Sequence, residues 1–461
     1  MTSLGRTLIR GFKAYDLRGR IPDELNTDVA YRVGRAYATW LGAKRVVVGR
    51  DIRLSSAELC AALIRGLTDQ GCHVEDIGLC GTEGVYFATG HLQADGGIMV
   101  TASHNPPDYN GMKFVREQSR PVSGDTGLVE IHALAEAGEF TDPAATGTVK
   151  PVNAMEDYLA HLMSYVDVAQ LQPLHLVCHA GNGGAGLIVD RLESRLPFRW
   201  TKLDHAPDGT FPNGVPNPML VDNQGRVAAL VRSAGADFGI AWDGDYDRCF
   251  FFDEHGTFLE GYYIVGLLAQ SFIAQEPGAR VLYDPRLTWN TIDLAERAGG
   301  VPVMCKSGHA FMKAKMREQD AAYGGEMSAH HYFRRFFYCD SGMVPWLLVA
   351  QLVSQTGKTL GQLVAERLVA FPASGEINLR VPDAKSVLAA VQAQFGVGAQ
   401  LDFTDGVSIE HAQWRMNLRS SNTEPLLRLN VESRADVALM QSKTAEVLAF
   451  LAARGGVRAD H

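Results

Sequence analysis

Residues 45–77 read RVVVGRDIRLSSAELCAALIRGLTDQGCHVEDI, and this segment carries the pattern of an α/β fold. The apolar run at 45–49 predicts a buried strand, and the segment at 73–77 predicts a second strand. The stretch between them has leucines at helical spacing, namely Leu59, Leu63 and Leu67. Ser55 and Glu58 form a predicted capping box at the start of this helix. A strand, a helix and a second strand in this order predict parallel strands with a helix packed on them.

The same alternation recurs along the chain. An amphipathic segment at 29–41 precedes the first strand, and the strand, loop and helix pattern returns three times, at 174–186, 238–253 and 280–291. From residue 377 the pattern changes to three strand segments and an alanine-rich terminal helix, which is typical of an α+β domain. We therefore expect three successive α/β mixed-sheet domains of similar topology and a smaller C-terminal α+β domain. Their predicted boundaries are 1–152, 153–256, 257–369 and 370–461.

The composition is that of an ordinary globular protein. The chain has 461 residues, of which 46% are hydrophobic and 21% charged, and this length is too great for one core. The formal net charge of −9 is spread along the chain, and no basic stripe indicates a nucleic-acid partner. The longest apolar run, residues 343–350, falls far short of the roughly 18 residues that span a bilayer, so no membrane partner is expected.

The seven cysteines are scattered and form no C-x-x-C pair, which argues against a disulfide framework or a zinc site. Free thiols are typical of a reducing compartment. The first 12 residues contain no continuous apolar segment of the kind found in signal peptides. The sequence therefore predicts a cytoplasmic protein.

Ser103 lies in the segment TASHNP, residues 101–106, which we call the serine loop. It follows the apolar run at 97–100, so a strand is expected to deliver its hydroxyl to a turn. Thr101 and Asn105 stand where the G-x-S-x-G elbow needs glycine, which argues against a lipase-like hydrolase. Two interpretations remain: Ser103 caps a local turn, as turn serines commonly do, or it is a covalent relay.

Residues 181–186 read GNGGAG and fit the G-x-G-x-x-G fingerprint of dinucleotide-binding folds. They follow the apolar strand at 175–178, and Asp204 lies near the distance expected of a ribose-binding acid. The alternative is structural, because glycines allow a tight turn and close helix packing in any α/β unit. An NAD-dependent oxidoreductase would leave the motifs below unexplained.

Residues 243–248 read DGDYDR and form the aspartate loop, in which Asp243, Asp245 and Asp247 stand at alternate positions after the apolar stretch 238–242. Alternate residues of an extended chain share a face, so the three carboxylates can surround one hard divalent cation. An EF-hand is excluded because its sixth position must be glycine and here is Arg248. The alternative is a solvated acidic turn, but buried strands on both sides favour a metal, and oxygen-only ligands indicate Mg²⁺.

Residues 419–425 read RSSNTEP and form the arginine loop. It offers Arg419, Ser421, Asn422 and Thr423, and the strand that follows carries Arg428. Guanidinium groups bind two phosphate oxygens at once, and hydroxyl and amide groups can complete the shell of a phosphate dianion. The alternative is an ordinary polar hairpin.

Residues 325–330 read GEMSAH and form the glutamate loop. Glu326 and Ser328 can exchange hydrogen bonds with vicinal sugar hydroxyls, and His330 is available for proton transfer. The alternatives are a solvated loop glutamate and a packed histidine pair at His330 and His331.

Taken in this order, the four loops resemble those of the α-D-phosphohexomutase family, and the chain looks like its bacterial phosphomannomutase branch. The match runs from FKAYDLRG at 12–19 to Arg428 and includes NGMK at 110–113. By resemblance, the serine loop is the phosphoserine loop of the family, and the other three bind metal, sugar and phosphate. The four loops come from four successive domains around one central cleft in that family.

The resemblance implies that mannose 6-phosphate and mannose 1-phosphate are interconverted through a phosphoserine at Ser103 and a hexose 1,6-bisphosphate intermediate. Mg²⁺ is held by Ser103 and the three aspartates. Glucose phosphates are expected as further substrates, because the family grips the sugar at O3 and O4 and mannose differs from glucose only at C2. The remaining implied site residues are Arg18, Lys113, Arg248 and His330 as catalytic groups, and Tyr15, Arg286 and His309 as substrate contacts.

Several alternatives stay open at this point. Phosphoglucomutase activity could be the main one. A sugar-phosphate-binding protein would need the arginine loop but neither Ser103 nor the three aspartates. A metallophosphatase would normally require more histidine and aspartate ligands than the one aspartate triplet supplies. We expect a monomer or a weak homo-oligomer.

Overall fold

The computed structural model describes residues 1–421 and 426–459, which form two compact units. The first unit consists of Met1–Thr257 and Arg335–Gly357, and the second of Phe258–Arg334 and Lys358–His461. Within the described residues, no helix has both the length and the apolar character needed to cross a membrane.

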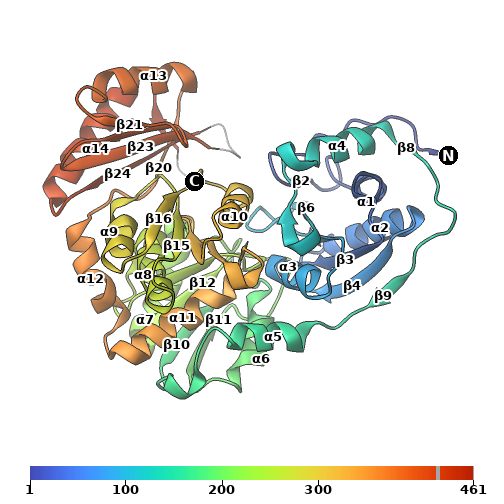
Figure 1. The fold of residues 1–461 in the computed structure, drawn as a ribbon, viewed down its shortest axis with the longest axis horizontal. Coiled ribbons are helices and arrows are strands. Elements are labelled where there is room, and N and C mark those ends of the chain that lie inside the picture. The colour runs from blue at the N-terminus through green and yellow to red at the C-terminus, as the bar shows by residue number, and fades with distance from the viewer. Residues whose placement is uncertain (422–425, 460–461) are drawn as a thin grey trace. The chain divides into compact units, whose positions relative to one another are not determined.

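The first unit begins with a mixed sheet in the strand order β2-β6-β5-β3-β4-β9, with β7 paired to β6 (Figure 1). Its strands are β2 (Leu17–Arg20), β3 (Arg45–Arg50), β4 (His73–Leu79), β5 (Gly96–Val100), β6 (Tyr109–Arg116), β7 (Arg120–Pro121) and β9 (Val149–Pro151). Its helices are α1 (Thr27–Leu41), α2 (Ser56–Asp69), α3 (Thr82–His91) and α4 (Leu128–Ala137). A small two-stranded sheet pairs β1 (Thr2–Ser3) with β8 (Glu139–Phe140).

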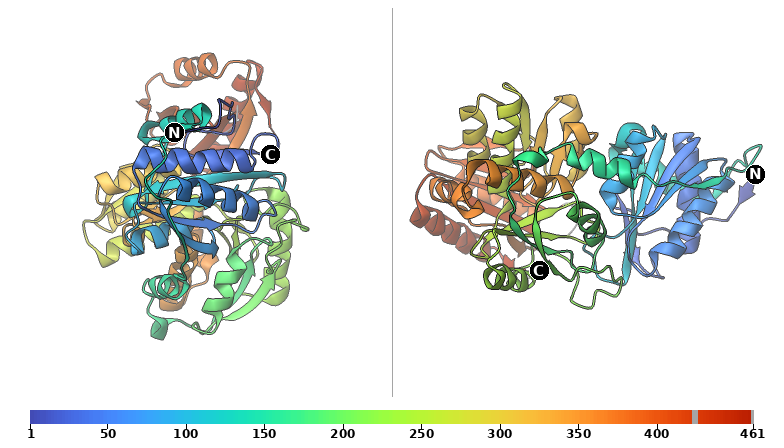
Figure 2. Two further views of the ribbon diagram at one scale, coloured as in Figure 1. Left: turned by 90° about the vertical axis from the view of Figure 1, so that its right-hand side faces the viewer. Right: turned by 90° about the horizontal axis from the view of Figure 1, so that it is seen from below.

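Helices cover both faces of this sheet, as the views of Figure 2 show. Val46 and Val48 of β3 belong to one apolar cluster with residues of α1, α2 and α4. Val47, which points to the opposite face, packs with Val85 and Ala88 of α3. Because both faces are buried, the strand sequence is a continuous apolar run rather than an alternating one.

The predicted capping box of α2 is wrong. Ser55 has helical φ and ψ angles of −82° and −10°, and its side chain caps no amide of the helix. Its hydroxyl instead accepts a hydrogen bond of 2.8 Å from Asn110 Nδ2 of β6. A long-range contact of this kind cannot be read from local spacing.

The next two sheets repeat the topology of the first. In each, a central strand has parallel partners on both sides, and the second partner pairs antiparallel with a fourth strand: β4-β3-β5-β6, β11-β10-β12-β13 and β16-β15-β17-β18. The strands of the second sheet include β10 (His175–His179), β11 (Arg199–Leu203), β12 (Phe238–Trp242) and β13 (Cys249–Phe252), and those of the third include β15 (Arg280–Tyr283), β16 (Val301–Met304), β17 (Tyr323–Gly325) and β18 (His331–Phe333).

The helices of these two sheets follow the same alternation. Those of the second sheet are α5 (Met155–Met163), α6 (Ala185–Glu193) and α7 (Val221–Ala234), and those of the third are α8 (Gly261–Gln275), α9 (Trp289–Arg297), α10 (His309–Glu318) and α12 (Leu360–Ala370). Residues 335–357, with β19 (Cys339–Asp340) and α11 (Met343–Thr356), pack with the first unit. β14 (Phe258–Leu259) opens the second unit.

The repeated topology places three of the predicted loops at equivalent positions. The serine loop joins β5 to β6, the aspartate loop joins β12 to β13, and the glutamate loop joins β17 to β18. Each holds one non-glycine residue in the left-handed region, with φ of 49° at Ser103, 47° at Tyr246 and 66° at Ala329. Such conformations are uncommon outside glycine and concentrate at functional sites.

The last sheet has the strand order β21-β22-β23-β24-β20-β25. Its elements are β20 (Ile377–Arg380), α13 (Ala384–Phe395), β21 (Gln400–Asp402), β22 (Val407–Glu410), β23 (Trp414–Ser420), β24 (Leu427–Ser433), α14 (Val437–Ala452) and β25 (Val457–Arg458). Both helices share one apolar core with the sheet, through residues such as Val391, Met416 and Val447. Three repeated α/β sheets and one α+β domain confirm the predicted fold class, whereas the four exact boundaries stay predictions.

Candidate functional site

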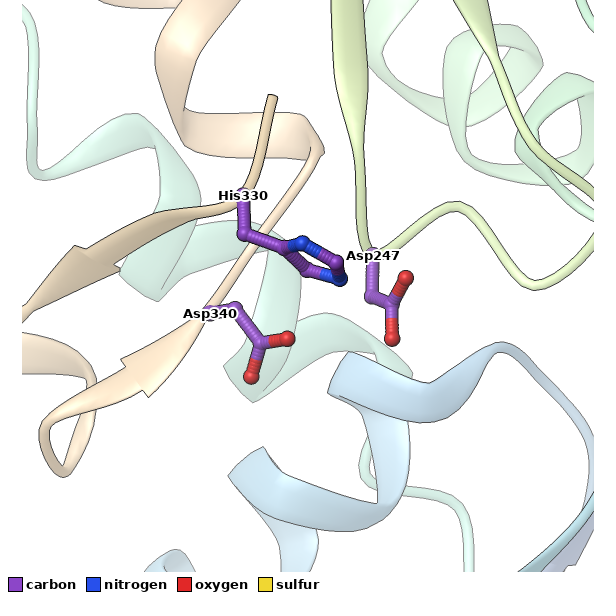
Figure 3. Close-up of side chains that lie close together, drawn as sticks. All are labelled: Asp247, His330 and Asp340. Carbon is purple, nitrogen blue, oxygen red and sulfur yellow. The ribbon is translucent and has the colours of Figure 1, made fainter. Parts of the chain in front are cut away.

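The aspartate loop forms a buried acidic cluster in the first unit. One carboxylate oxygen each of Asp243, Asp245 and Asp247 lies within 4.8 Å of the others, and all three side chains are buried. A fourth carboxylate, Asp340 of β19, has an oxygen within 4.8 Å of one of Asp247 (Figure 3). The sequence analysis did not identify Asp340, which lies 93 positions from Asp247 in the chain.

The electrostatics of this cluster favour a cation. Burial and then the charge of Asp245 raise the pKa of Asp247 well above its ordinary value, although Lys113 opposes the shift. Asp245 Oδ1 is buried and accepts no hydrogen bond from any described residue. A divalent cation would neutralise the crowded carboxylates and use the oxygen that protein donors leave open, so the donor set fits a hard metal ion.

Ser103 lies against this cluster. Its Oγ donates a hydrogen bond of 2.8 Å to Asp243 Oδ2, which also accepts one of 2.9 Å from Arg248 Nε. Gly244 makes this approach possible, because a Cβ there would lie 2.5 Å from the carbonyl oxygen of Ser103. His104, which the sequence analysis missed, lies 3.1 Å from Ser103 Oγ through Nδ1 and also contacts Arg248. The hydroxyl is therefore held beside the acidic cluster and a guanidinium group.

Two further predicted residues belong to the same set. Lys113 Nζ donates to Asp245 Oδ2 at 2.7 Å and to Asp247 Oδ2 at 2.6 Å, so its ammonium group lies among the carboxylates. Arg18 donates to Asn105 Oδ1 of the serine loop at 2.6 Å and is paired with Asp16 at 2.7 Å. Tyr15 is half-buried, three positions before Arg18.

Arg53 holds the serine loop in place and was not predicted. Its guanidinium group donates to the carbonyl oxygens of Ser103, Asn105, Pro106 and Tyr109 at 2.9, 2.6, 2.7 and 2.9 Å. The side chain is buried and lies 3.4 Å from Asp51. One planar group thus fixes four carbonyls around the turn in which Ser103 adopts its left-handed conformation.

The glycine loop at 181–186 serves the aspartate loop. Gly184 N donates to Gly244 O at 3.1 Å, and a Cβ on Gly183 would lie 2.8 Å from the same oxygen. The carboxylate of Asp204, the expected ribose-binding acid, accepts hydrogen bonds from Arg226 through both oxygens. These contacts support the structural interpretation of the glycines over the dinucleotide interpretation.

In the second unit, the glutamate loop meets Arg286. The guanidinium group of Arg286 forms a forked pair with Asp284 at 2.8 and 2.9 Å, and its Nη2 lies 3.6 Å from Glu326 Oε1 and 3.3 Å from Ser328 Oγ. His330 Nδ1 lies 3.2 Å from Ser328 Oγ. Burial raises the pKa of Glu326. The structure therefore brings together four of the predicted residues.

The backbone of Gly308 also belongs to this set, because its N–H donates to Glu326 Oε1 at 2.8 Å. His309 follows it as the first residue of α10. Glu326 is thus held from a second loop of the same unit.

The arginine loop contributes a second basic group to this unit. Arg419 and Arg428 are direct cross-strand partners on β23 and β24. Both approach Glu376, which was not predicted, at 3.7 and 3.1 Å. Arg286 approaches the same carboxylate at 3.4 Å. Ser421 is half-buried one position after β23, and the predicted phosphate ligands Asn422 and Thr423 lie outside the described residues.

Comparison with known proteins covers nearly the whole chain. Four models of phosphoglucomutase/phosphomannomutase match it: alpha/beta/alpha domains I, II and III at residues 10–142, 156–256 and 260–371, and the C-terminal domain at 376–449. The chain belongs to the phosphoglucomutase/phosphomannomutase family. This membership agrees with the structural interpretation of the glycine loop.

Individual relatives are similar over their full lengths. The chain is 60% identical over 442 residues to the phosphohexose mutases of Xanthomonas campestris pv. campestris (strain B100), covering 95% of this chain and 98% of that protein. It is 55% identical over 448 residues to the phosphomannomutase of Escherichia coli (strain K12), covering 95% and 98%. The crystal structure of a phosphoglucomutase/phosphomannomutase family protein from Burkholderia thailandensis superposes with a TM-score of 0.87 at 31% identity, covering 97% and 98%.

Proposed function

We propose that this protein is a phosphomannomutase that interconverts mannose 6-phosphate and mannose 1-phosphate and also accepts glucose phosphates. The observation that carries the proposal is the hydrogen bond of 2.8 Å from Ser103 Oγ to Asp243, within a cluster of three buried carboxylates. A serine so placed suits reversible phosphoryl transfer, and family membership supports the same activity.

In the proposed reaction, the resting enzyme carries a phosphoryl group on Ser103 Oγ. The bond between phosphorus and Oγ breaks as a bond forms to the free hydroxyl oxygen of a hexose monophosphate. The hydroxyl proton passes to a protein base, for which His330 is the proposed group, whereas the ammonium group of Lys113, which is paired with Asp245 and Asp247, is suited to hold the transferring phosphoryl oxygens. The resulting hexose 1,6-bisphosphate reverses its orientation, and its other phosphoryl group returns to Ser103. Arg248 and Arg18 provide fixed positive charge near the transferring group, where electrostatic stabilisation dominates catalysis.

Mg²⁺ is the proposed cofactor, because the ligands offered by Asp243, Asp245 and Asp247 are all hard oxygen atoms. When bound, this ion supplies positive charge that offsets the charge on the transferring phosphoryl oxygens. Ser103 would add a further ligand through its phosphoryl group. The orphaned Oδ1 of Asp245 supports this assignment.

The second unit supplies the proposed sugar and phosphate contacts. Glu326 and Ser328 are suited to grip two vicinal hydroxyls, which exchange places when the bisphosphate reverses. Arg286, His309 and the arginine loop are suited to the phosphate that is not being transferred. Because none of these groups is assigned to the hydroxyl at C2, the site is expected to discriminate weakly between mannose and glucose.

The substrate preference is therefore a direct test. We expect mutase activity with both mannose 1-phosphate and glucose 1-phosphate, with kcat/KM values that differ by less than about a thousandfold, which is roughly 4 kcal/mol. Coupled assays with each sugar, started with a trace of glucose 1,6-bisphosphate, would measure it. A larger preference would contradict dual specificity, and no turnover of either sugar would contradict the proposed function.

Arg53 gives a second test, which concerns the positioning of Ser103. Lysine retains the charge of Arg53 but cannot donate to four carbonyls, so Arg53→Lys is expected to lower kcat about a hundredfold through misplacement of the serine loop, with little change in KM. Steady-state assays with mannose 1-phosphate would show this split. The control is Arg45→Lys on β3, whose half-exposed side chain pairs with Glu75 away from the loop. Equal kcat values for the two variants would contradict the positioning role.

A further inference from the structure

Glu376 is a buried carboxylate shared by three arginines of the second unit. Its side chain is only 6% exposed and lies one position before β20. Oε1 lies 3.1 Å from Arg428 Nη1, while Oε2 lies 3.4 Å from Arg286 Nη1 and 3.7 Å from Arg419 Nη2. Buried carboxylates are rare unless they are paired, and this one contacts three positive groups at once.

The arginines come from two sheets, and the fold fixes their positions. Arg419 and Arg428 face each other across β23 and β24, on the side of the sheet opposite its apolar core. Arg286 follows β15 and is itself anchored by Asp284. Among the described residues, Glu376 is the one carboxylate with oxygens within 4.0 Å of a guanidinium nitrogen of each of the three arginines.

The charge balance of this group has a consequence for anion binding. Asp284 pairs with Arg286, Glu326 lies 3.6 Å from the same guanidinium group, and Asp405 lies 3.7 Å from Arg419 Nε, so with Glu376 the three guanidinium groups already face four carboxylates. Burial raises the pKa of Glu376, but the charges of Arg428, Arg286 and Arg419 outweigh burial and hold it below its ordinary value. An incoming phosphate dianion therefore meets arginines whose charge is largely offset, and it is repelled by a carboxylate that stays ionised.

A mutase that retains a bisphosphate intermediate must also loosen its contacts to that intermediate while the intermediate reverses its orientation. Three arginines without an opposing charge would bind a phosphate dianion strongly in either orientation, and strong binding of the intermediate slows the step in which it reverses. Resting on the proposed function, we propose that Glu376 is a fixed counter-anion of the phosphate subsite. It positions the three arginines and weakens their binding of phosphate, so that the bisphosphate can reverse its orientation between the two transfer steps.

The test is Glu376→Gln in the full chain, because glutamine keeps the shape of the side chain and removes its charge. With Ser103→Ala as the background to prevent transfer, inorganic phosphate is expected to bind about tenfold tighter or more in a calorimetric titration. When Glu376→Gln is made in the protein that retains Ser103, both KM for mannose 1-phosphate and kcat are expected to fall. A purely structural role of Glu376 predicts the opposite for binding, namely weaker phosphate and a higher KM, and unchanged or weaker binding overturns the proposal.

Glu446→Gln is the matched control. Glu446 is an exposed residue of α14 that pairs with Lys443 at 2.8 Å, so this change removes the same charge from the same domain away from the subsite. Its phosphate affinity is expected to equal that of the parent. An equal gain in affinity for Glu446→Gln would show a general charge effect and overturn the specific role of Glu376.

Stability provides a second measurement if Glu376→Gln folds poorly. Without the carboxylate, the arginines repel one another, and phosphate is expected to raise the melting temperature of the variant by more than that of the parent. An equal or smaller increase overturns the proposal. If phosphate binds more tightly to the Glu376→Gln variant but the wild-type protein turns over no hexose phosphate, the proposed function fails while the counter-anion role stands. If the wild-type protein is active and Glu376→Gln does not raise the phosphate affinity, the proposed function stands and the counter-anion role fails.

Discussion

Replacing Ser103 with alanine is expected to lower mutase activity by at least about 10⁴-fold, which is roughly 5.4 kcal/mol of transition-state stabilisation. The variant removes one oxygen atom, which is the proposed acceptor and donor of the phosphoryl group. Purified wild-type protein is expected to show a population heavier by one phosphoryl group, and the alanine variant is expected to lack it. A coupled assay with mannose 1-phosphate and intact-mass measurement of both proteins would check the two expectations.

Ser123→Ala is a suitable control for this experiment. Ser123 caps the short 3₁₀ helix at Gly124–Thr126 in the same unit and has no contact with the aspartate loop among its described hydrogen bonds. It is expected to keep full activity and the full phosphoryl content. Full activity of Ser103→Ala would contradict the covalent relay, and a phosphoryl group that persists in that variant would locate the modified residue elsewhere.

Much of the fold could be predicted because its signals are local. Apolar runs such as 45–49 predict buried strands, and the leucines of α2 mark the face that packs on them. The four-strand order that the three α/β sheets share agrees with the predicted similarity of topology, although their amino-acid sequences are not alike. That similarity depends on which strands pair, and pairing is a long-range property that local periodicity only suggests.

The residues of the candidate site can be divided in the same way, into those with a local sequence signal and those that depend on long-range contacts. Asp243, Asp245 and Asp247 were predictable because their spacing in one loop already brings them together. Arg53 and Glu376 were not, because each acts through loops far from it in the sequence, and neither lies in a motif of its own. Arg53 is 50 positions from Ser103, whose carbonyl it holds, and Glu376 is 90 positions from Arg286.

The serine and aspartate loops illustrate why such partners escape a reading of the sequence. Gly244 had no assigned role in the predicted metal loop, but the structure shows that its missing side chain admits the carbonyl oxygen of Ser103. The glycines at 181–186 fit a dinucleotide fingerprint, yet they pack against the aspartate loop. A glycine in a sequence can indicate that a side chain has no room at that position, but it does not identify the neighbouring group that occupies the space.

Changing Asp245 to asparagine is expected to lower mutase activity about a thousandfold, roughly 4 kcal/mol, and to remove most of the stabilisation that Mg²⁺ gives to the protein. Asp245 Oδ1 is a buried oxygen of the aspartate loop that accepts no hydrogen bond from the described residues, so it is an expected metal ligand, and an amide oxygen carries no full charge to hold the cation.

Without Mg²⁺, Asp245→Asn is expected to melt below the temperature of the wild type. Asp245 and Asp247 share the ammonium group of Lys113, and the charge of Asp245 contributes to the raised pKa of Asp247. Burial raises the pKa of Asp245, but the charge of Lys113 outweighs burial and holds this pKa below its ordinary value, so the ionised carboxylate stabilises the fold and its loss is expected to destabilise the metal-free protein. Melting curves with EDTA and with added Mg²⁺ would separate these effects, and Asp222→Asn at the exposed start of α7 is the control. If Mg²⁺ stabilised Asp245→Asn as much as the wild type, the metal would have to bind elsewhere, and the charge of the aspartate loop would need a different explanation.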